Sequence, residues 1–137
     1  MTHPRPQRAR EAALWLVGLI DAGVLVRVPE IADYEVRREL LRADKTEGVA
    51  RLVRLAGEIG YLPLCTEAMR LAARFWADAR KRGQPTAPDE SIDADVILAA
   101  QAILAEDGGA NTVEVATTNP RHLSRFVNAR SWQEIRA

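Results

Sequence analysis

The amino-acid sequence predicts an α/β protein in which a parallel sheet is covered by helices on both faces. Short segments rich in β-branched residues alternate with longer segments of helical periodicity along the whole chain. The 137 residues are enough for one domain with a real core, and 47% of them are hydrophobic. The charged fraction of 28% suits a folded protein rather than a disordered one. We therefore expect a single domain over residues 1–137.

Helical segments are recognised by apolar residues at every third or fourth position. The expected helices are 7–22, 30–43, 46–59, 66–83, 91–104 and 119–126, followed by a last turn at 131–135. The clearest of them is the fourth, which Thr66 opens as N-cap and Gly83 closes. Prolines and turn residues make 83–91 a loop.

Three short segments are expected to be strands. They are VLVRVP at 24–29, YLPLC at 61–65 and VEVAT at 113–117, with Pro63 counting against the second. Because helices separate them, the strands should run parallel.

Charge and residue usage exclude several classes of site. Lys and Arg together number 19, as do Asp and Glu, so no general polyanion-binding surface follows from the net charge of zero. The single Cys65 excludes an intramolecular disulfide, and with only His3 and His122 beside it no Cys/His zinc site can form. Any metal must therefore be bound by oxygen, and Cys65 itself is expected to be buried and inert.

The chain carries no recognisable membrane or export segment. The longest apolar run, at 12–20, is too short to span a bilayer, and the first residues lack the layout of a secretory signal. We expect a cytoplasmic protein.

Oxygen ligands follow or precede the expected strands at places that a parallel sheet would bring together. Sites in such sheets form beyond the carboxyl ends of the strands. Glu35 follows the first strand, Asp95 lies in the expected first turn of helix 91–104, and Asn119 follows the third strand. Mg²⁺ and Mn²⁺ prefer such hard oxygen ligands, and a bound ion can lower the pKa of water for phosphodiester hydrolysis.

Each of these residues also has an ordinary structural explanation. Asp93 and Asp95 suit the start of a helix, where carboxylates cap exposed N–H groups. Glu35 can pair with Arg38 on a solvated helix face, and Asn119 is a good N-cap before Pro120.

Basic residues near these segments could form a rim that contacts phosphate, although a solvated surface is the commoner meaning of such residues. They are Arg37, Arg38, Arg42, Lys81, Arg82, Arg121 and Arg125.

Three segments resemble the PIN-domain family, the metal-dependent ribonucleases that include VapC-type toxins. They are PEIADYEVRREL at 29–40, DADVILAAQA at 93–102 and VATTNPRHLSRF at 115–126. The family places a Glu after its second strand, an Asp-x-x-Ile-Ala-Ala start on a later helix, and a Thr-x-Asp or Thr-x-Asn strand end. The resemblance covers nearly the whole chain.

The resemblance implies a three-layer α/β/α fold and an Mg²⁺- or Mn²⁺-dependent endoribonuclease. Glu35, Asp95 and Asn119 match the family's second, third and fourth ligand positions, and Asp93 is an additional carboxylate. Glu35 and Asp95 would be the catalytic pair. The implied partners are an RNA substrate, an antitoxin protein and a second copy of the chain in a homodimer.

The chain departs from the family at its first strand. PIN domains open with a central strand that carries the first metal-binding Asp, and the residues MTHPRP cannot form it. We expect a start codon assigned too late, so that residues 1–137 lack this strand and are inactive alone. The alternative is a catalytically inactive PIN-like module that binds protein or RNA. A generic α/β carrier or response domain ranks last, because neither a glycine-rich phosphate loop nor a phospho-acceptor Asp is present.

Overall fold

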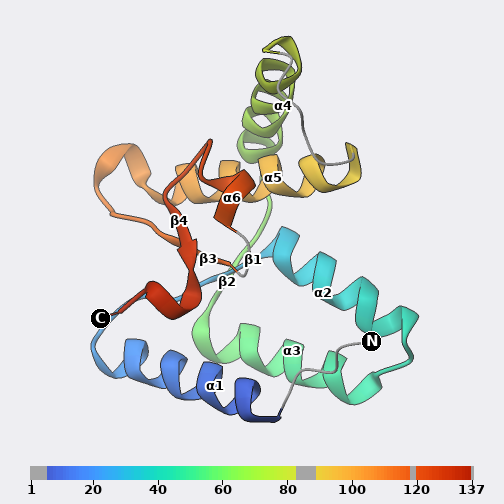
Figure 1. Ribbon diagram of the computed structural model, residues 1–137, viewed down its shortest axis with the longest axis vertical. Helices are drawn as coiled ribbons and strands as arrows, with labels where there is room; N and C mark the ends of the chain where they lie inside the picture. The colour runs from blue at the N-terminus through green and yellow to red at the C-terminus, as the bar shows by residue number, and fades with distance from the viewer. Residues whose placement is uncertain (1–5, 83–88, 118–119, 137) are drawn as a thin grey trace.

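The structure is a computed structural model that describes residues 6–82, 89–117 and 120–136 (Figure 1). Six helices dominate it: α1 (Pro6–Asp21), α2 (Glu30–Arg42), α3 (Thr46–Ile59), α4 (Thr66–Lys81), α5 (Asp89–Ala105) and α6 (Pro120–Leu123). The strands are β1 (Val28–Pro29), β2 (Tyr61–Leu62), β3 (Val115–Thr117) and β4 (Ala129–Ser131). Two 3₁₀ turns, Asp107–Gly109 and Trp132–Glu134, complete the chain. The predicted mixture of helices and parallel strands is confirmed.

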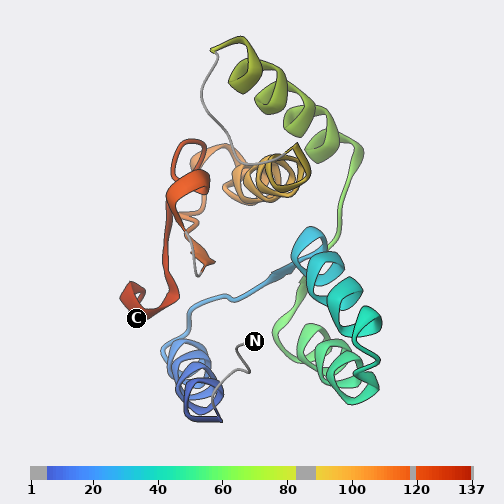
Figure 2. The same cartoon turned by 45° about the vertical axis from the view of Figure 1, so that its right-hand side comes forward.

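The strands form two separate parallel pairs. β1 pairs with β2, with Val28 opposite Tyr61, and β3 pairs with β4, with Val115 opposite Ala129. Within the described ranges, no backbone pairing joins β1 to β3. Figure 2 shows the two pairs on either side of the centre of the molecule. The described sheet is therefore two half-sheets rather than the single one expected.

The strands and the last helix differ most from the prediction, and α6 covers only Pro120–Leu123 of the expected range 119–126. β1 occupies only the end of the expected strand 24–29, and the expected strand 61–65 is reduced to two residues. β4 was not predicted, because three residues are too few to show a period and their strand character comes from pairing with β3.

The start of α4 corrects two expectations. The N-cap is Cys65 rather than Thr66, and its Sγ accepts a hydrogen bond of 3.4 Å from the backbone N–H of Ala68. Cys65 is exposed rather than buried. The residue lies three positions after the end of β2 and directly before α4.

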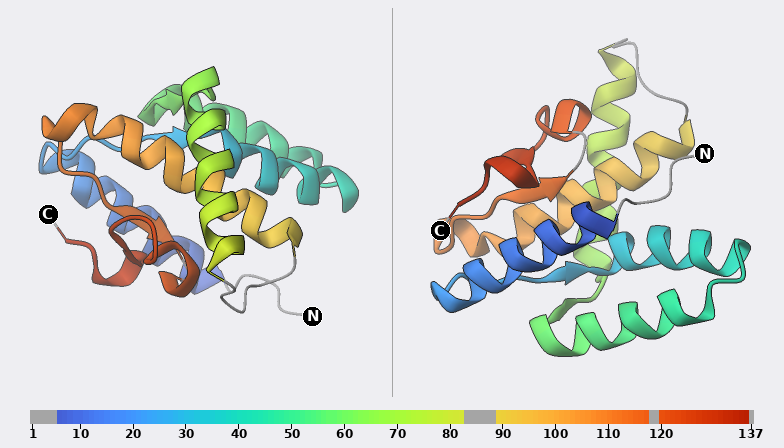
Figure 3. Two further views of the ribbon diagram at one scale, coloured as in Figure 1. Left: turned by 90° about the horizontal axis from the view of Figure 1, so that it is seen from above. Right: turned by 60° about the horizontal axis from the view of Figure 1, so that its bottom comes forward.

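The main core lies between α4 and α5, which cross closely (Figure 3). Small side chains allow this approach: Ala72 of α4 is 3% exposed and Ala100 of α5 is fully buried. Phe75 and Phe126 pack beside them with ring centroids 5.3 Å apart. The ring contact attaches the segment before β4 to α4, and α6 packs on α5.

A second contact region joins α1 to the C-terminal segment. The indole Nε1 of Trp15 donates a 2.8 Å hydrogen bond to the backbone carbonyl of Ile135. The rings of Trp15 and Trp132 meet edge to face with centroids 5.4 Å apart. Among the described residues, α1 packs little against the other helices, so these contacts hold much of it in place.

The molecule exposes more surface than its mass predicts. Its accessible area is 9719 Å², whereas a compact monomer of 15.2 kDa exposes about 7,100 Å². Large apolar side chains account for part of the excess: Leu14 is 67% exposed and Leu25, just before β1, is 80% exposed. Apolar side chains of α1 and of the chain entering β1 therefore lack a covering layer.

Candidate functional site

The candidate site lies where α2 and α5 meet. α2 begins directly after β1, and its first turns carry Glu30, Asp33 and Glu35. α5 runs beside the start of α2, as Figure 1 and the contacts between the two helices show. The exit of β1 thus delivers carboxylates of α2 to the flank of α5, as the rule for parallel sheets predicts.

Two side chains fix the start of α2. The Oε1 of Gln101, on α5, accepts a 3.3 Å hydrogen bond from the backbone N–H of Ile31, while its Nε2 donates a 2.8 Å bond to the carbonyl of Leu62. The Oε1 of Glu30 accepts a 2.7 Å bond from the backbone N–H of Leu64. These bonds tie α2 to α5 and to the chain leaving β2.

Sequence reasoning missed Gln101, although a signal was present. It is the only polar residue in the run VILAAQAIL at 96–104, and a lone amide in an apolar helix face points to a buried hydrogen-bonded role.

Glu35 is a partly buried carboxylate in an acidic environment. Its side chain is 39% exposed, and the Nη2 of Arg38 lies 3.9 Å from its Oε2. Burial raises the pKa of Glu35 above its ordinary value, and the charge of Asp95 raises this pKa further, against the lowering effect of Arg38. Glu35 and Asp95 are therefore close enough to interact electrostatically.

The position of Asp95 within α5 differs from the prediction. α5 begins at Asp89, so Asp93 and Asp95 lie past the first helical turn instead of within it. Capping and the helix dipole act within that first turn, and they no longer account for Asp95. Asp93 is exposed, whereas Asp95 is partly buried. Of the two, only Asp95 faces Glu35 closely enough to affect its pKa.

Asp33 is already engaged by an arginine. Its two carboxylate oxygens accept hydrogen bonds of 2.9 and 3.1 Å from Arg37, and Asp33 is 7% exposed. The hydrogen bond to Asp33 is the main cause that raises the pKa of Arg37. The ion pair thus engages Arg37, a member of the expected basic rim, with a carboxylate of its own helix.

The expected basic rim is partly occupied in the same way. Arg42 pairs with Glu39 through a contact of 2.6 Å between its Nη2 and Oε2. Arg38 lies over the ring of Tyr34, 5.3 Å from its centroid, as well as near Glu35. Arg38 is therefore the member of the predicted rim that lies beside the carboxylates.

Asn119, the fourth predicted ligand, lies outside the described residues. β3 ends at Thr117 and α6 begins at Pro120, and α6 packs on α5. Among the residues the structure describes, no three His, Cys, Asp or Glu side chains form a metal-binding group. The described part of the site is the pair Glu35 and Asp95.

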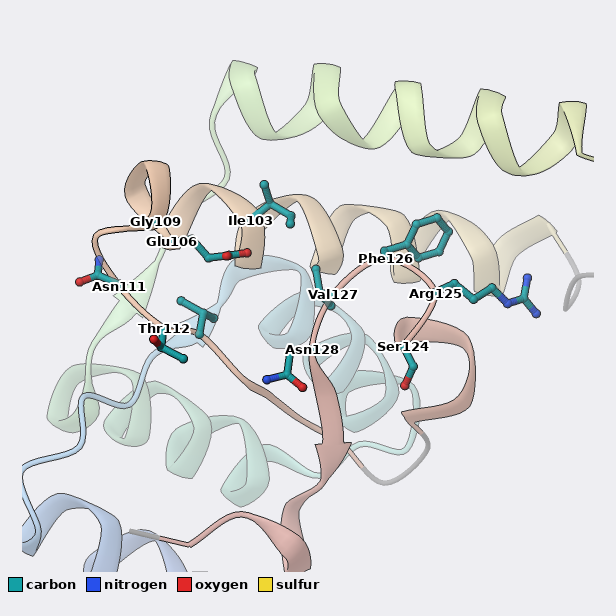
Figure 4. Close-up of a pocket in the computed structure, with 11 residues that line it drawn as sticks. Ile103, Glu106, Gly109, Asn111, Thr112, Ser124, Arg125, Phe126, Val127 and Asn128 are labelled. Carbon is teal, nitrogen blue, oxygen red and sulfur yellow. The ribbon is translucent and has the colours of Figure 1, made fainter.

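A hollow of about 490 Å³ lies at the other end of α5 (Figure 4). Ile103 and Glu106 line it from α5, and Ser124, Phe126 and Asn128 line it from the segment that leads to β4. Neither Glu35 nor Asp95 lines it. The chemistry-bearing carboxylates and the hollow are therefore separate features.

Within the described part of the chain, no helix is long and apolar enough to cross a membrane. Comparisons of the chain with protein-family models, with curated proteins and with solved structures gave no match.

Proposed function

We propose that this protein is a PIN-like ribonuclease that hydrolyses RNA phosphodiester bonds with Mg²⁺ or Mn²⁺. The observation that carries the proposal is the juxtaposition of Glu35 and Asp95. They come from two helices and two distant parts of the sequence, and the charge of one acts on the other. Neither local helix pairing nor capping explains a carboxylate pair of this kind.

The donor set suits a hard divalent cation. Two carboxylates that repel each other gain from a shared cation, and Mg²⁺ is usually bound by one or two protein carboxylates, with water and substrate phosphate completing its shell. Glu35 and Asp95 would bind the ion, Asn119 would add an amide oxygen, and Asp93 would assist from outside the pair. When bound, the ion supplies charge neutralisation at the scissile phosphate and a lowered pKa for water.

The residues of the chain have distinct roles in this proposal. Glu35 and Asp95 must both be ionised to act as ligands, and the raised pKa of Glu35 sets the lower pH bound of that state. Arg38 stands beside Glu35 and offers a guanidinium to a phosphate oxygen. Gln101 and Glu30 keep α2 in place relative to α5 and β2.

We also propose that the complete sheet is PIN-like and has a fifth strand between β1 and β3. Support comes from two parallel pairs that are not joined in the described ranges, together with apolar side chains of α1 and Leu25 left exposed. A parallel strand placed between them would join the half-sheets and cover those side chains. The helices would then form the outer layers of a three-layer α/β/α fold.

The function is tested by RNA cleavage and by ion binding. We expect the protein with its sheet complete to cleave RNA in Mg²⁺ or Mn²⁺, to lose cleavage in EDTA, and to lose it in Asp95→Asn. We also expect Mn²⁺ to broaden the amide NMR signals of residues 35 and 95 together. Cleavage that persists unchanged in EDTA or in Asp95→Asn would overturn the proposal.

A non-catalytic binding module is the second candidate. It is motivated by the finding that no three candidate ligands form a metal-binding group within the described residues. RNA binding that is indifferent to divalent ions, without cleavage by the complete protein, would support this candidate over the ribonuclease.

A further inference from the structure

Gln101 is the most buried polar side chain that the proposed chemistry does not use directly. It is 2% exposed and lies on α5 among Ala99, Ala100 and Ala102, which are all buried. Burying an amide costs free energy unless its polar atoms are hydrogen-bonded. Both ends of the Gln101 amide are bonded, one to the N–H of Ile31 and one to the carbonyl of Leu62.

These two bonds connect the two helices that carry the carboxylates. Gln101 belongs to α5, as does Asp95, and its acceptor oxygen receives the N–H of Ile31. Ile31 lies one helical turn before Glu35 on α2, so the two residues share a face of the helix. The bond to Leu62 fixes the same amide to the end of β2 and sets its orientation.

We infer that Gln101 is a positioning residue that fixes the relative positions of Glu35 and Asp95 by tying the start of α2, the helix of Glu35, to α5, the helix of Asp95. This inference rests on the proposed function for its consequence in ion binding, but the tie itself can be tested without metal. Ligands must be held to within about 0.5 Å of a productive arrangement, and residues that orient ligands typically change metal affinity by about 10- to 100-fold when altered.

The first experiment is metal-free hydrogen exchange on residues 1–137, followed by NMR. In the unaltered protein the Ile31 amide should exchange slowly, because it is buried and bonded to Gln101. In Gln101→Leu, protection should fall at Ile31 and in the first turn of α2 more than in α4. If Gln101→Leu does not fold, the same measurement is made on Gln101→Met, which keeps the side-chain length and removes the amide.

Ala72→Leu is the matched control. Ala72 is buried in the contact between α4 and α5 and makes none of the hydrogen bonds described for Gln101. A general loss of stability would raise exchange at many amides in both variants, whereas the tie predicts a selective loss in α2. An Ile31 amide that exchanges rapidly in the unaltered protein would overturn the inference.

The second experiment measures Mn²⁺ affinity and the amides that Mn²⁺ broadens. We expect affinity to fall at least tenfold in Gln101→Leu and the joint broadening at residues 35 and 95 to be lost, with less than a twofold change in Ala72→Leu. Unchanged affinity in Gln101→Leu would overturn the positioning role. If the unaltered protein binds no Mn²⁺, the ribonuclease proposal fails, and so does the expected effect of Gln101 on Mn²⁺ affinity. The hydrogen-exchange experiment tests separately whether Gln101 ties α2 to α5.

Discussion

Glu35 on α2 and Asp95 on α5 are carboxylates on two helices that contact each other, and the pKa of Glu35 is raised mainly by burial and further by the charge of Asp95. Arg38 opposes this effect from 3.9 Å. The pair depends on the chain path through β1 and on the bonds of Gln101, because the two residues are not neighbours on one helix. Carboxyl groups whose pKa is raised by burial and by a second carboxyl group occur often at functional sites.

Replacing Asp95 by Asn should lower the pKa of Glu35 and leave the fold intact. The change removes the charge that raises this pKa while keeping the side-chain volume. Metal-dependent RNA cleavage by the protein with the proposed strand added should fall by about 100-fold or more. NMR titration of the Glu35 carboxyl, circular dichroism and a cleavage assay check the three effects.

Asp93→Asn is the control for this prediction. Asp93 lies two positions earlier on the same helix and is exposed, and it is not among the groups that shift Glu35. The Glu35 pKa should stay within the error of the unaltered protein. Equal effects of the two substitutions would show that net charge near α5, rather than the specific pair, controls Glu35.

Helices could be predicted from the sequence closely because their signals are local. α3 matches the expected range 46–59, and α2 ends one residue earlier than expected. Strands depend on partners elsewhere in the chain, so β4 escaped prediction and the expected strand 24–29 shrank to Val28–Pro29. The local apolar pattern cannot show how many residues will find a partner.

The site was predictable to the extent that its residues follow strands or carry a motif. Glu35 and Asp95 were identified in this way, and their role as ligands stays a prediction; the structure places them on two helices in contact, α2 and α5. The earlier start of α5 was not foreseen, because the prolines before it suggested a longer loop. The engagement of Asp33 by Arg37 and the bonds of Gln101 depend on side-chain geometry that the sequence pattern does not contain.

The raised pKa of Glu35 predicts a pH-dependent contribution to stability. The folded state holds the Glu35 proton more tightly than the unfolded chain, whose carboxyl keeps its ordinary pKa of 4.5. Between that value and the raised one, the folded state binds more protons, so the free energy of unfolding contributed by Glu35 decreases as pH rises. At pH values below this window, which lies between the ordinary and the raised pKa of Glu35, the stabilising contribution is fully present.

The side chain in the variant Glu35→Gln cannot ionise, so this variant should not lose stability as the pH rises through the window. The stability of the variant relative to the unaltered protein should therefore be lowest below about pH 4 and increase through the window to a plateau. Urea unfolding at a series of pH values measures the difference. Added salt should reduce the part of this stability difference that is due to the charge of Asp95 and leave the part that is due to burial. A difference that is flat across pH would show that Glu35 is not perturbed.

Because α4 and α5 cross closely, substitutions at two adjacent alanines of α4 should change the stability of the protein by different amounts. Ala72 is 3% exposed within the core, while Ala73 is exposed. Ala72→Leu adds volume to a full contact and should destabilise the protein by about 1–3 kcal/mol. Ala73→Leu should stay within about 0.5 kcal/mol, because alanine and leucine both favour helices. Similar urea midpoints for the two variants would contradict the packing described between α4 and α5.

Trp15→Phe should loosen α1 and the C-terminal segment before it affects the α4 and α5 core. The substitution removes the 2.8 Å hydrogen bond to the Ile135 carbonyl, a loss of about 0.5–1.5 kcal/mol, and keeps an aromatic ring against Trp132. Hydrogen exchange should therefore rise in α1 and near Ile135 more than in α5. Trp76→Phe is the control, because Trp76 is 39% exposed and its ring contacts Arg80 on the surface.

The two half-sheets predict that residues 1–137 alone are marginally stable and inactive. The edge of β1 away from β2 has no strand partner in the described residues, and apolar side chains of α1 are exposed. Unpaired backbone groups cost about 1–3 kcal/mol each when buried, against a stability of about 5–15 kcal/mol for an ordinary domain. A strand between β1 and β3 would remove that cost.

We therefore expect the chain extended by the residues encoded in frame upstream of Met1 to unfold at a higher urea concentration. The slope of its unfolding free energy against urea should also be steeper, because more surface becomes exposed on unfolding. Equal midpoints and slopes would show that no strand is added there. RNA cleavage in Mg²⁺ by residues 1–137 alone would show that a carboxylate from an added strand is dispensable and that the described pair suffices.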